Sequence, residues 1–193
     1  MEGRKKLPKK LLSEYTNLVF DCDGVVLNSN RVKTLAFRDA ALLYGDIAAD
    51  KLVSYHVANG GVSRYKKFSY FLDNIVRPTS YEAELLQLLK RYSAAVKDGL
   101  IECQVTPGLK RLRDATPAAR WLIVSGGDQA ELREIFATRG LDKLFDGGIF
   151  GSPATKDEIF ERETACGRLS GATLFLGDSV YDYAAAKQAG IDF

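Results

Sequence analysis

The chain has 193 residues and a net charge of +2, with 46% of its residues apolar and 27% charged. This length fits one domain, or one domain with an insertion, and the composition is that of an ordinary globular protein. No apolar run approaches the roughly 20 residues of a membrane span, and the start lacks the apolar core of a secretory signal. Three cysteines without metal-ligand spacing favour reduced thiols and a cytoplasmic location.

The chain begins with a basic segment, which we interpret as a solvated tail over residues 1–12. Its basic residues are Arg4, Lys5, Lys6, Lys9 and Lys10. Such a run is also found in nucleic-acid-binding arms, but no basic stripe with interleaved aromatic residues supports that function elsewhere. We therefore expect neither nucleic acid nor a membrane as a partner.

A short apolar strand followed by two aspartates is the first regular element. Leu18-Val19-Phe20 reads as a buried parallel strand, and Asp21 and Asp23 come directly after it. In an extended chain both aspartates leave the backbone on the same side, with Cys22 facing the other way. Two carboxylates this close repel each other, and hard oxygen ligands of this kind suit Mg²⁺. The alternative is an Asp-rich turn without a ligand.

The next segment is helical throughout. Apolar periodicity predicts helices over residues 31–46, 49–58, 62–76 and 80–97. Gly60-Gly61 separates the second helix from the third, because paired glycines break helices. This stretch contains no convincing strand.

From residue 105 onward helices and strands alternate. Strands are expected at 120–124, 148–150 and 172–176, and helices at 108–115, 128–139, 156–166 and 180–189. This alternation predicts an α/β fold with a parallel sheet covered by helices on both faces. We therefore expect a Rossmann-like core over residues 13–30 and 105–193 that carries a helical cap at residues 31–104.

The last residues resemble the beginning of another strand. Gly190 reads as a helix stop, and Ile191-Asp192-Phe193 follows it. We expect either a truncated chain or a sheet that ends with a stub.

Polar residues directly follow three of the predicted strands. Asp21 with Asp23, Ser125, and Asp178 hold these positions. Ligands of open parallel sheets bind beyond the carboxyl ends of the strands, so these side chains should converge at one edge. Ser125 and the two glycines after it precede a helix, and a hydroxyl, small residues and a helix N-terminus together suit a phosphate. Lys156 opens another helix, where a cation is unfavourable and therefore hints at a nearby anion.

These motifs resemble those of the haloacid dehalogenase-like superfamily, in the family's order. The resemblance covers residues 17–193. In the phosphatases of this family the first motif reads D-x-D-G-V and is followed by an Asp-Ser pair. The positions that carry it are Asp21, Asp23, Gly24, Ser125, Lys156, Gly177-Asp178-Ser179 and Asp182. The helical insertion is similar to the cap of the phosphoglycolate phosphatase and β-phosphoglucomutase subgroup. Asn28 departs from the family, which usually has Asp at this hinge position.

The resemblance implies a Mg²⁺-dependent phosphatase acting on a small phosphorylated metabolite, such as a sugar or organic-acid phosphate. Asp21 would be the nucleophile that forms an aspartyl-phosphate. Asp23 would protonate the leaving alkoxide and then deprotonate the attacking water. Ser125, Gly126, Gly127 and Lys156 would hold the phosphate.

The same resemblance implies a metal site built mainly from carboxylates. Asp21, the backbone carbonyl of Asp23, and Asp178 would bind Mg²⁺. Asp182 would contribute directly or through water. The spacing Ser179-x-x-Asp182 also reads as a helix cap, and we leave both roles open.

The predicted cap offers candidates for binding the rest of the substrate. His56, Arg64 and Lys67 surround Gly60-Gly61, and cap loops near such glycines reach into the active site in the family. Arg64 is the strongest candidate, because its planar guanidinium suits a carboxylate or a second anionic group. His56, the single histidine, also fits a structural role.

Two other functions remain open at this point. A phosphomutase like β-phosphoglucomutase would use the same nucleophile, acid–base Asp23 and cap, but pass the phosphate to a second sugar hydroxyl. A regulatory protein that retained the fold without activity is the alternative from another class. We expect a monomer or a homodimer.

Overall fold

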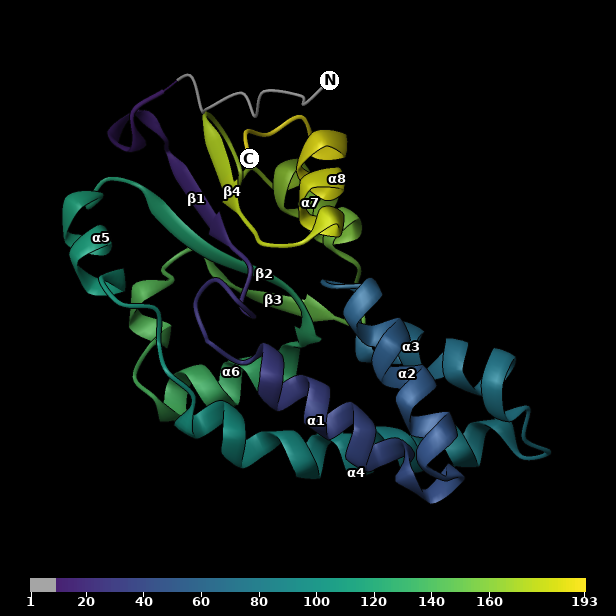
Figure 1. The fold of residues 1–193 in the computed structure, drawn as a ribbon. Helices are drawn as coiled ribbons and strands as arrows, with labels where there is room; N and C mark the ends of the chain where they lie inside the picture. Colours follow the sequence, from purple (N-terminus) through teal and green to yellow (C-terminus); the bar gives the residue numbers. More distant parts are fainter. Residues whose placement is uncertain (1–9) are drawn as a thin grey trace, which may run out of the picture.

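The computed structural model describes residues 10–193, and its centre is a sheet of four parallel strands. The strand order is β3-β2-β1-β4 (Figure 1). The strands are β1 (Asn17–Phe20), β2 (Arg120–Asp128), β3 (Gly148–Ser152) and β4 (Thr173–Leu176). The predicted α/β class is confirmed. Most of the predicted basic tail, residues 1–9, lies outside the described residues.

Helices cover both faces of the sheet, because successive strand residues point to opposite sides. Phe20 lies in the same apolar cluster as Phe136 of α6 (Gln129–Thr138). Val19 instead packs with α7 (Lys156–Ala165) and α8 (Val180–Ala189) on the other face. A further short helix, α5 (Leu109–Ala115), precedes β2. All four residues of β1 are buried, as expected of a central parallel strand.

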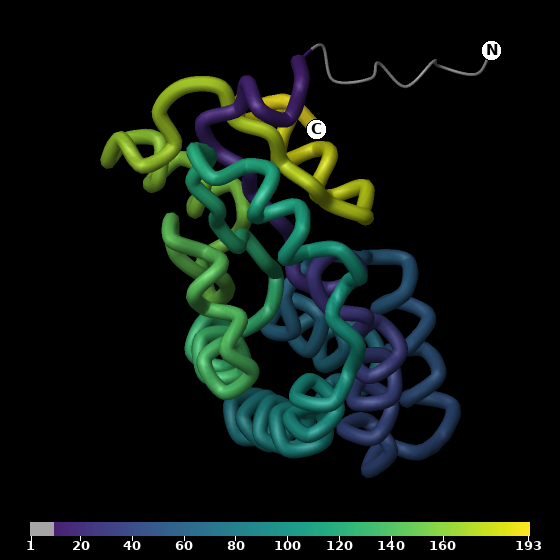
Figure 2. Tube along the Cα trace, turned by 90° about the vertical axis from the view of Figure 1, so that its left-hand side faces the viewer, coloured from purple at the N-terminus to yellow at the C-terminus, as the bar shows by residue number. Residues whose placement is uncertain are grey.

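Between residues 30 and 102 the chain forms four α-helices that lie to one side of the sheet (Figures 1 and 2). They are α1 (Asn30–Ala41), α2 (Asp46–Ala58), α3 (Arg64–Phe71) and α4 (Tyr81–Glu102). Phe37 at their centre lies 4.5 Å from the ring of Tyr92 and 5.2 Å from that of Phe68, centroid to centroid. Aromatic pairs at these separations stabilise a core beyond the area they bury.

The chain leaves the core and returns to it at one place. The backbone N–H of Asn28 donates to the carbonyl of Gln104 over 2.9 Å, and that of Thr106 donates to Val26 over 2.9 Å. Leu27 and Val105 between them form an antiparallel bridge. The insertion is therefore joined to the core by two adjacent segments. Its definition as a separate cap over residues 31–104 stays a prediction.

Some elements extend further than the sequence indicated. Helix α4 continues to Glu102, five residues beyond the expected end at 97. Strand β2 runs through Ser125 and both glycines to Asp128, where we expected a turn after Val124. The pairing with β3 shifts between Val124 and Asp128, so the glycines lie in an irregular strand end. Near the C-terminus, Asp192 forms a parallel bridge with Leu174.

Candidate active site

Of the residues expected at the carboxyl edge of the sheet, Asp21, Asp23 and Asp178 line one cavity, whereas Ser125 is fully buried and is not part of its lining. A cavity of about 700 Å³ opens at this edge, a volume typical of small-molecule sites. The core contributes Asp21, Asp23, Gly126, Gly127 and Asp178 to its lining. The helical insertion contributes residues that include His56, Arg64 and Lys67, so the cavity lies between the sheet and the insertion.

Asp21 and Lys156 form a buried ion pair at the end of β1. The Lys156 Nζ atom lies 2.8 Å from Asp21 Oδ1, and it also contacts Asp182 Oδ1. Burial raises the pKa of Asp21 to about 6, although the charge of Lys156 acts in the opposite direction. Burial also opposes the charge of Lys156, but the two carboxylates outweigh it and raise its pKa. Lys156, the first residue of α7, thus lies beside the carboxylate of Asp21. Its unfavourable position at the start of a helix had suggested such a nearby anion.

Asp182 has the N-terminal capping role that its spacing predicted. Its Oδ2 atom accepts hydrogen bonds from the backbone N–H groups of Asp178 (3.2 Å) and Ser179 (3.0 Å). The Ser179 side chain in turn accepts from the backbone N–H of Asp182, which completes a capping box at α8. Since Oδ1 faces Lys156, both carboxylate oxygens already have partners.

Three carboxylates are grouped closely enough to bind a metal ion. Asp21, Asp178 and Asp182 each offer an oxygen, and these atoms lie within 4.8 Å of one another. Gly24 leaves the space that Asp178 occupies: a Cβ atom there would come within 1.9 Å of Asp178 Oδ2, and its φ of +77° also disfavours other residues. This set of hard oxygen ligands fits Mg²⁺. Asp21 and Asp178 are the better ligands, because the oxygens of Asp182 are already engaged.

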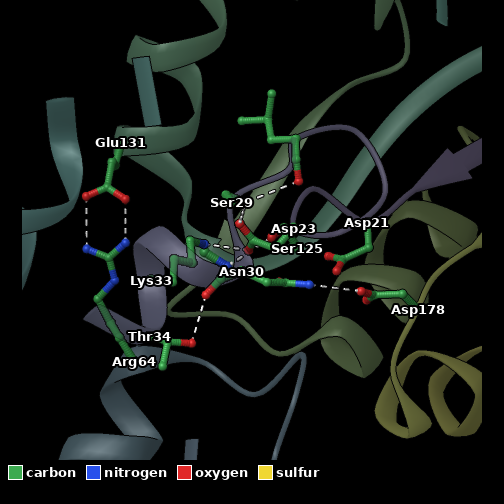
Figure 3. A network of polar contacts seen from close by, with 12 residues as sticks. Asp21, Asp23, Ser29, Asn30, Lys33, Thr34, Arg64, Ser125, Glu131 and Asp178 are labelled. Carbon is green, nitrogen blue, oxygen red and sulfur yellow. Dashed lines mark hydrogen bonds and ion pairs between the residues drawn. The ribbon is translucent and has the colours of Figure 1, made fainter. Parts of the chain in front are cut away.

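Asp23 is held as a carboxylate by two side chains (Figure 3). One belongs to Ser29, the N-cap of α1, and the other to Lys33 within that helix. Ser29 Oγ and Lys33 Nζ each lie 2.5 Å from its oxygens. Burial raises the pKa of Asp23, but Lys33 and Ser29 outweigh it and hold the pKa below its ordinary value. The sequence had given no role to either partner. The structure therefore adds Lys33 to the group of charged residues at this edge.

The Ser125-Gly126-Gly127 segment meets the insertion directly. The backbone N–H of Gly127 donates to Ser125 Oγ over 3.0 Å, so the hydroxyl is fixed at the end of β2. A Cβ atom on Gly126 would come within 2.2 Å of the Gly61 carbonyl oxygen. Only glycine at position 126 therefore lets the insertion loop pack against this segment.

Arg64 has a different partner from the one expected. Its guanidinium makes a bidentate contact with Glu131 of α6, with Nη1 2.9 Å from Oε2 (Figure 3). Nη1 also lies 3.0 Å from Ser93 Oγ, and the group packs 4.4 Å from the centroid of Tyr92. Arg64 thus links the insertion to the core, and the charge of its guanidinium is balanced by Glu131. Its role in binding substrate stays a prediction.

His56 and Lys67 form a hydrogen-bonded chain at the insertion side of the cavity. Lys67 Nζ lies 2.9 Å from His56 Nδ1, and His56 Nε2 lies 3.2 Å from Thr34 Oγ1. Because Thr34 donates its hydroxyl to the Asn30 carbonyl over 2.8 Å, it must accept from Nε2–H. Nδ1 is then the acceptor for Lys67. Burial, reinforced by the charge of Lys67, lowers the pKa of His56 to about 3 and keeps the ring neutral.

Comparison with known proteins agrees with this geometry. A family model described as haloacid dehalogenase-like hydrolase matches residues 15–190. The chain belongs to the haloacid dehalogenase-like hydrolases. Among curated proteins, none matches the sequence significantly. Within residues 10–193, no helix is both long and apolar enough to cross a membrane.

Several solved structures have the same fold, and the names of some refer to a phosphatase or a phosphomutase. A protein from Haemophilus somnus predicted to be a phosphoglycolate phosphatase has a TM-score of 0.69 and 19% identity, over 93% of this chain and 84% of its own. One from Thermotoga maritima, provisionally named β-phosphoglucomutase, has a TM-score of 0.59 and 18% identity, over 91% of this chain and 82% of its own. A haloacid dehalogenase-like protein from Bacteroides fragilis has a TM-score of 0.70 and 20% identity, over 92% and 85%.

His56 gives this hydrolase a pH-dependent stability that can be measured. Its pKa is about 3 in the folded protein and 6.5 in an ordinary environment. Between these values the unfolded chain binds a proton that the folded protein does not, so the free energy of unfolding falls as the pH falls. From pH 7 to pH 5 the wild type should lose about 1–2 kcal/mol more than His56→Gln. Urea unfolding at both pH values measures this difference, and equal losses in the two proteins would refute it.

Proposed function

We propose that this protein is a Mg²⁺-dependent phosphomonoester hydrolase that acts on a small phosphorylated metabolite through an aspartyl-phosphate on Asp21. The observation that carries the proposal is the pair of carboxylates at the end of β1. Asp21 is paired with Lys156, Asp23 is paired with Lys33, and both line one cavity. One carboxylate is thus available as a nucleophile beside a second that can transfer protons.

In the first step, a carboxylate oxygen of Asp21 attacks phosphorus, and the bond from phosphorus to the leaving alkoxide breaks. In the free protein Lys33 and Ser29 hold Asp23 as a carboxylate, so Asp23 would take up a proton when the negatively charged phosphate binds beside it. It then gives this proton to the alkoxide and becomes a carboxylate again. Lys156 balances charge at Asp21 throughout, while Ser125 Oγ and the glycines after it hold the phosphate oxygens.

In the second step, the carboxylate of Asp23 takes a proton from water as the water oxygen attacks phosphorus. The bond between phosphorus and Asp21 breaks, which releases inorganic phosphate and leaves the proton of the attacking water on Asp23. The ion pair with Lys33 favours the carboxylate form of Asp23, which is the form this step requires.

Asp21, Asp178 and the backbone carbonyl of Asp23 would hold Mg²⁺ beside the phosphate. When bound, the ion would neutralise charge on the phosphate oxygens. Asp182 would support this site indirectly, by fixing Lys156 and the start of α8.

The helical insertion would serve as the cap that excludes water and recognises the leaving group, because it supplies the wall of the cavity opposite the sheet. The names of the similar structures fit a phosphatase or a phosphomutase. A screen of phosphorylated metabolites with Mg²⁺, scored by released phosphate, tests the proposal and separates these two reactions. Conversion of a sugar phosphate to its isomer without release of phosphate would instead establish a mutase.

Removal of the metal should stop the reaction, and Asp178→Ala should weaken the dependence on it. A chelator should reduce turnover to background, and added Mg²⁺ should restore it. Because Asp178 would be lost as a ligand, the Mg²⁺ concentration for half-maximal rate should rise about tenfold or more. Titration of activity with Mg²⁺ measures the shift. Full activity in excess chelator would contradict the proposed metal dependence.

A further inference from the structure

Among residues 10–193, four basic residues are buried, and three of them have a carboxylate partner. Lys33 pairs with Asp23, Arg64 with Glu131, and Lys156 with Asp21 and Asp182. Lys67 is only 3% exposed and contacts no carboxylate. A buried ammonium without a counter-charge is costly, so an unpaired lysine in a cavity points to an anionic ligand.

Lys67 lines the cavity, and only one of its donors has a partner among the described residues. One N–H is donated to His56, whose orientation is fixed through Thr34. The ring of Phe37 lies 5.4 Å from Nζ and supports the cation on one side. An ammonium has three donors, so two remain for a ligand.

No nearby carboxylate is left to balance the positive charge of Lys67. Burial and then Lys33 lower its pKa to about 7, and Lys156 acts in the same direction. Asp23 and Asp21 oppose this shift, but each has its own lysine partner. An anion bound beside Nζ would stabilise the charged form of Lys67.

We propose that the leaving group of the substrate carries a carboxylate, and that Lys67, positioned by His56, binds it. A single ammonium with two free donors matches a carboxylate, whereas a second phosphate dianion would require more charge than Lys67 offers. This inference rests on the proposed hydrolase function. It transfers to Lys67 the role that the sequence had suggested for Arg64.

Three pairs of phosphomonoesters test the inference, because the members of each pair differ only in a carboxylate and a hydroxymethyl group. The pairs are 2-phosphoglycolate with 2-hydroxyethyl phosphate, 3-phosphoglycerate with glycerol 3-phosphate, and 6-phosphogluconate with sorbitol 6-phosphate. Wild-type kcat/KM should favour the acid in at least one pair by about 10- to 100-fold, the range for a charged hydrogen bond. In Lys67→Met this preference should fall to near unity.

Lys51→Met is the matched control, since Lys51 is an exposed lysine on α2, outside the cavity lining. It should keep the wild-type preference. Lys67→Met should unfold at or above the wild-type temperature, because an unpaired buried charge is removed. Lys67→Gln provides a second, polar variant, in which the preference should also be lost.

Hydrolysis of p-nitrophenyl phosphate separates this inference from the function on which it rests. If the wild type hydrolyses this ester but prefers no acid, or if Lys67→Met and Lys67→Gln keep the preference, the role of Lys67 is wrong and the hydrolase function stands. If the wild type hydrolyses neither p-nitrophenyl phosphate nor any of the six esters, the proposed function itself is wrong.

Discussion

Replacement of Asp21 by Asn should reduce phosphatase turnover to the uncatalysed background, a loss of about 10³-fold or more. Asn has nearly the same shape but lacks the negative charge that attacks phosphorus. The fold should survive, because Lys156 keeps its contact with Asp182 and can still donate to the amide oxygen. Steady-state release of phosphate measures the loss, and circular dichroism establishes that the variant is folded.

The matched control for this variant is Asp142→Asn. Asp142 is an exposed aspartate between α6 and β3. It begins a short 3₁₀ helix and is not part of the cavity lining. The control should retain wild-type activity. Substantial turnover by Asp21→Asn would refute the aspartyl-phosphate mechanism, because no other residue was assigned the attack on phosphorus.

Replacement of Asp23 by Asn should lower kcat for alkyl phosphates by about 10²- to 10⁴-fold, the usual contribution of a general acid and base. Lys33 would then lose its carboxylate partner, so the thermal stability of the variant must be measured beside its activity. The nucleophile Asp21 and its contact with Lys156 are unchanged.

An activated ester separates the two roles of Asp23. The leaving group of p-nitrophenyl phosphate needs little protonation, so Asp23→Asn should still form the intermediate and then hydrolyse it slowly. Rapid mixing should therefore show a burst of about one nitrophenolate per enzyme before a slow phase. Equal, small losses for alkyl and aryl esters without a burst would argue against proton transfer by Asp23.

The core of the fold was readable from the sequence because its signals are local. The apolar runs that became β1 and β4 are bounded by polar residues and glycines, and the turns after them carry the aspartates. Buried parallel strands of this kind are continuous in sequence and need no distant partner to be recognised. The edge at which Asp21 and Asp178 meet then followed from the parallel arrangement alone.

The ion pair between Arg64 and Glu131 was not readable from the sequence, because its two residues lie far apart in the chain. Arg64 and Glu131 are separated by 67 positions, and nothing local marks them as partners. Lys33 did leave a signal: it lies in phase with Ala36, Phe37 and Ala40 on the buried face of α1. A lysine on an apolar stripe implies a buried counter-charge, which here is Asp23.

A crystal structure of the protein with Mg²⁺ and beryllium fluoride is the most direct test of the aspartyl-phosphate proposal. Beryllium fluoride bound to a carboxylate has the charge and shape of an aspartyl-phosphate. We predict that it binds to a carboxylate oxygen of Asp21, within reach of Lys156 and Ser125. Binding to Asp23 or Asp178 in place of Asp21, or binding in the cavity without contact to Asp21, would contradict the proposed mechanism.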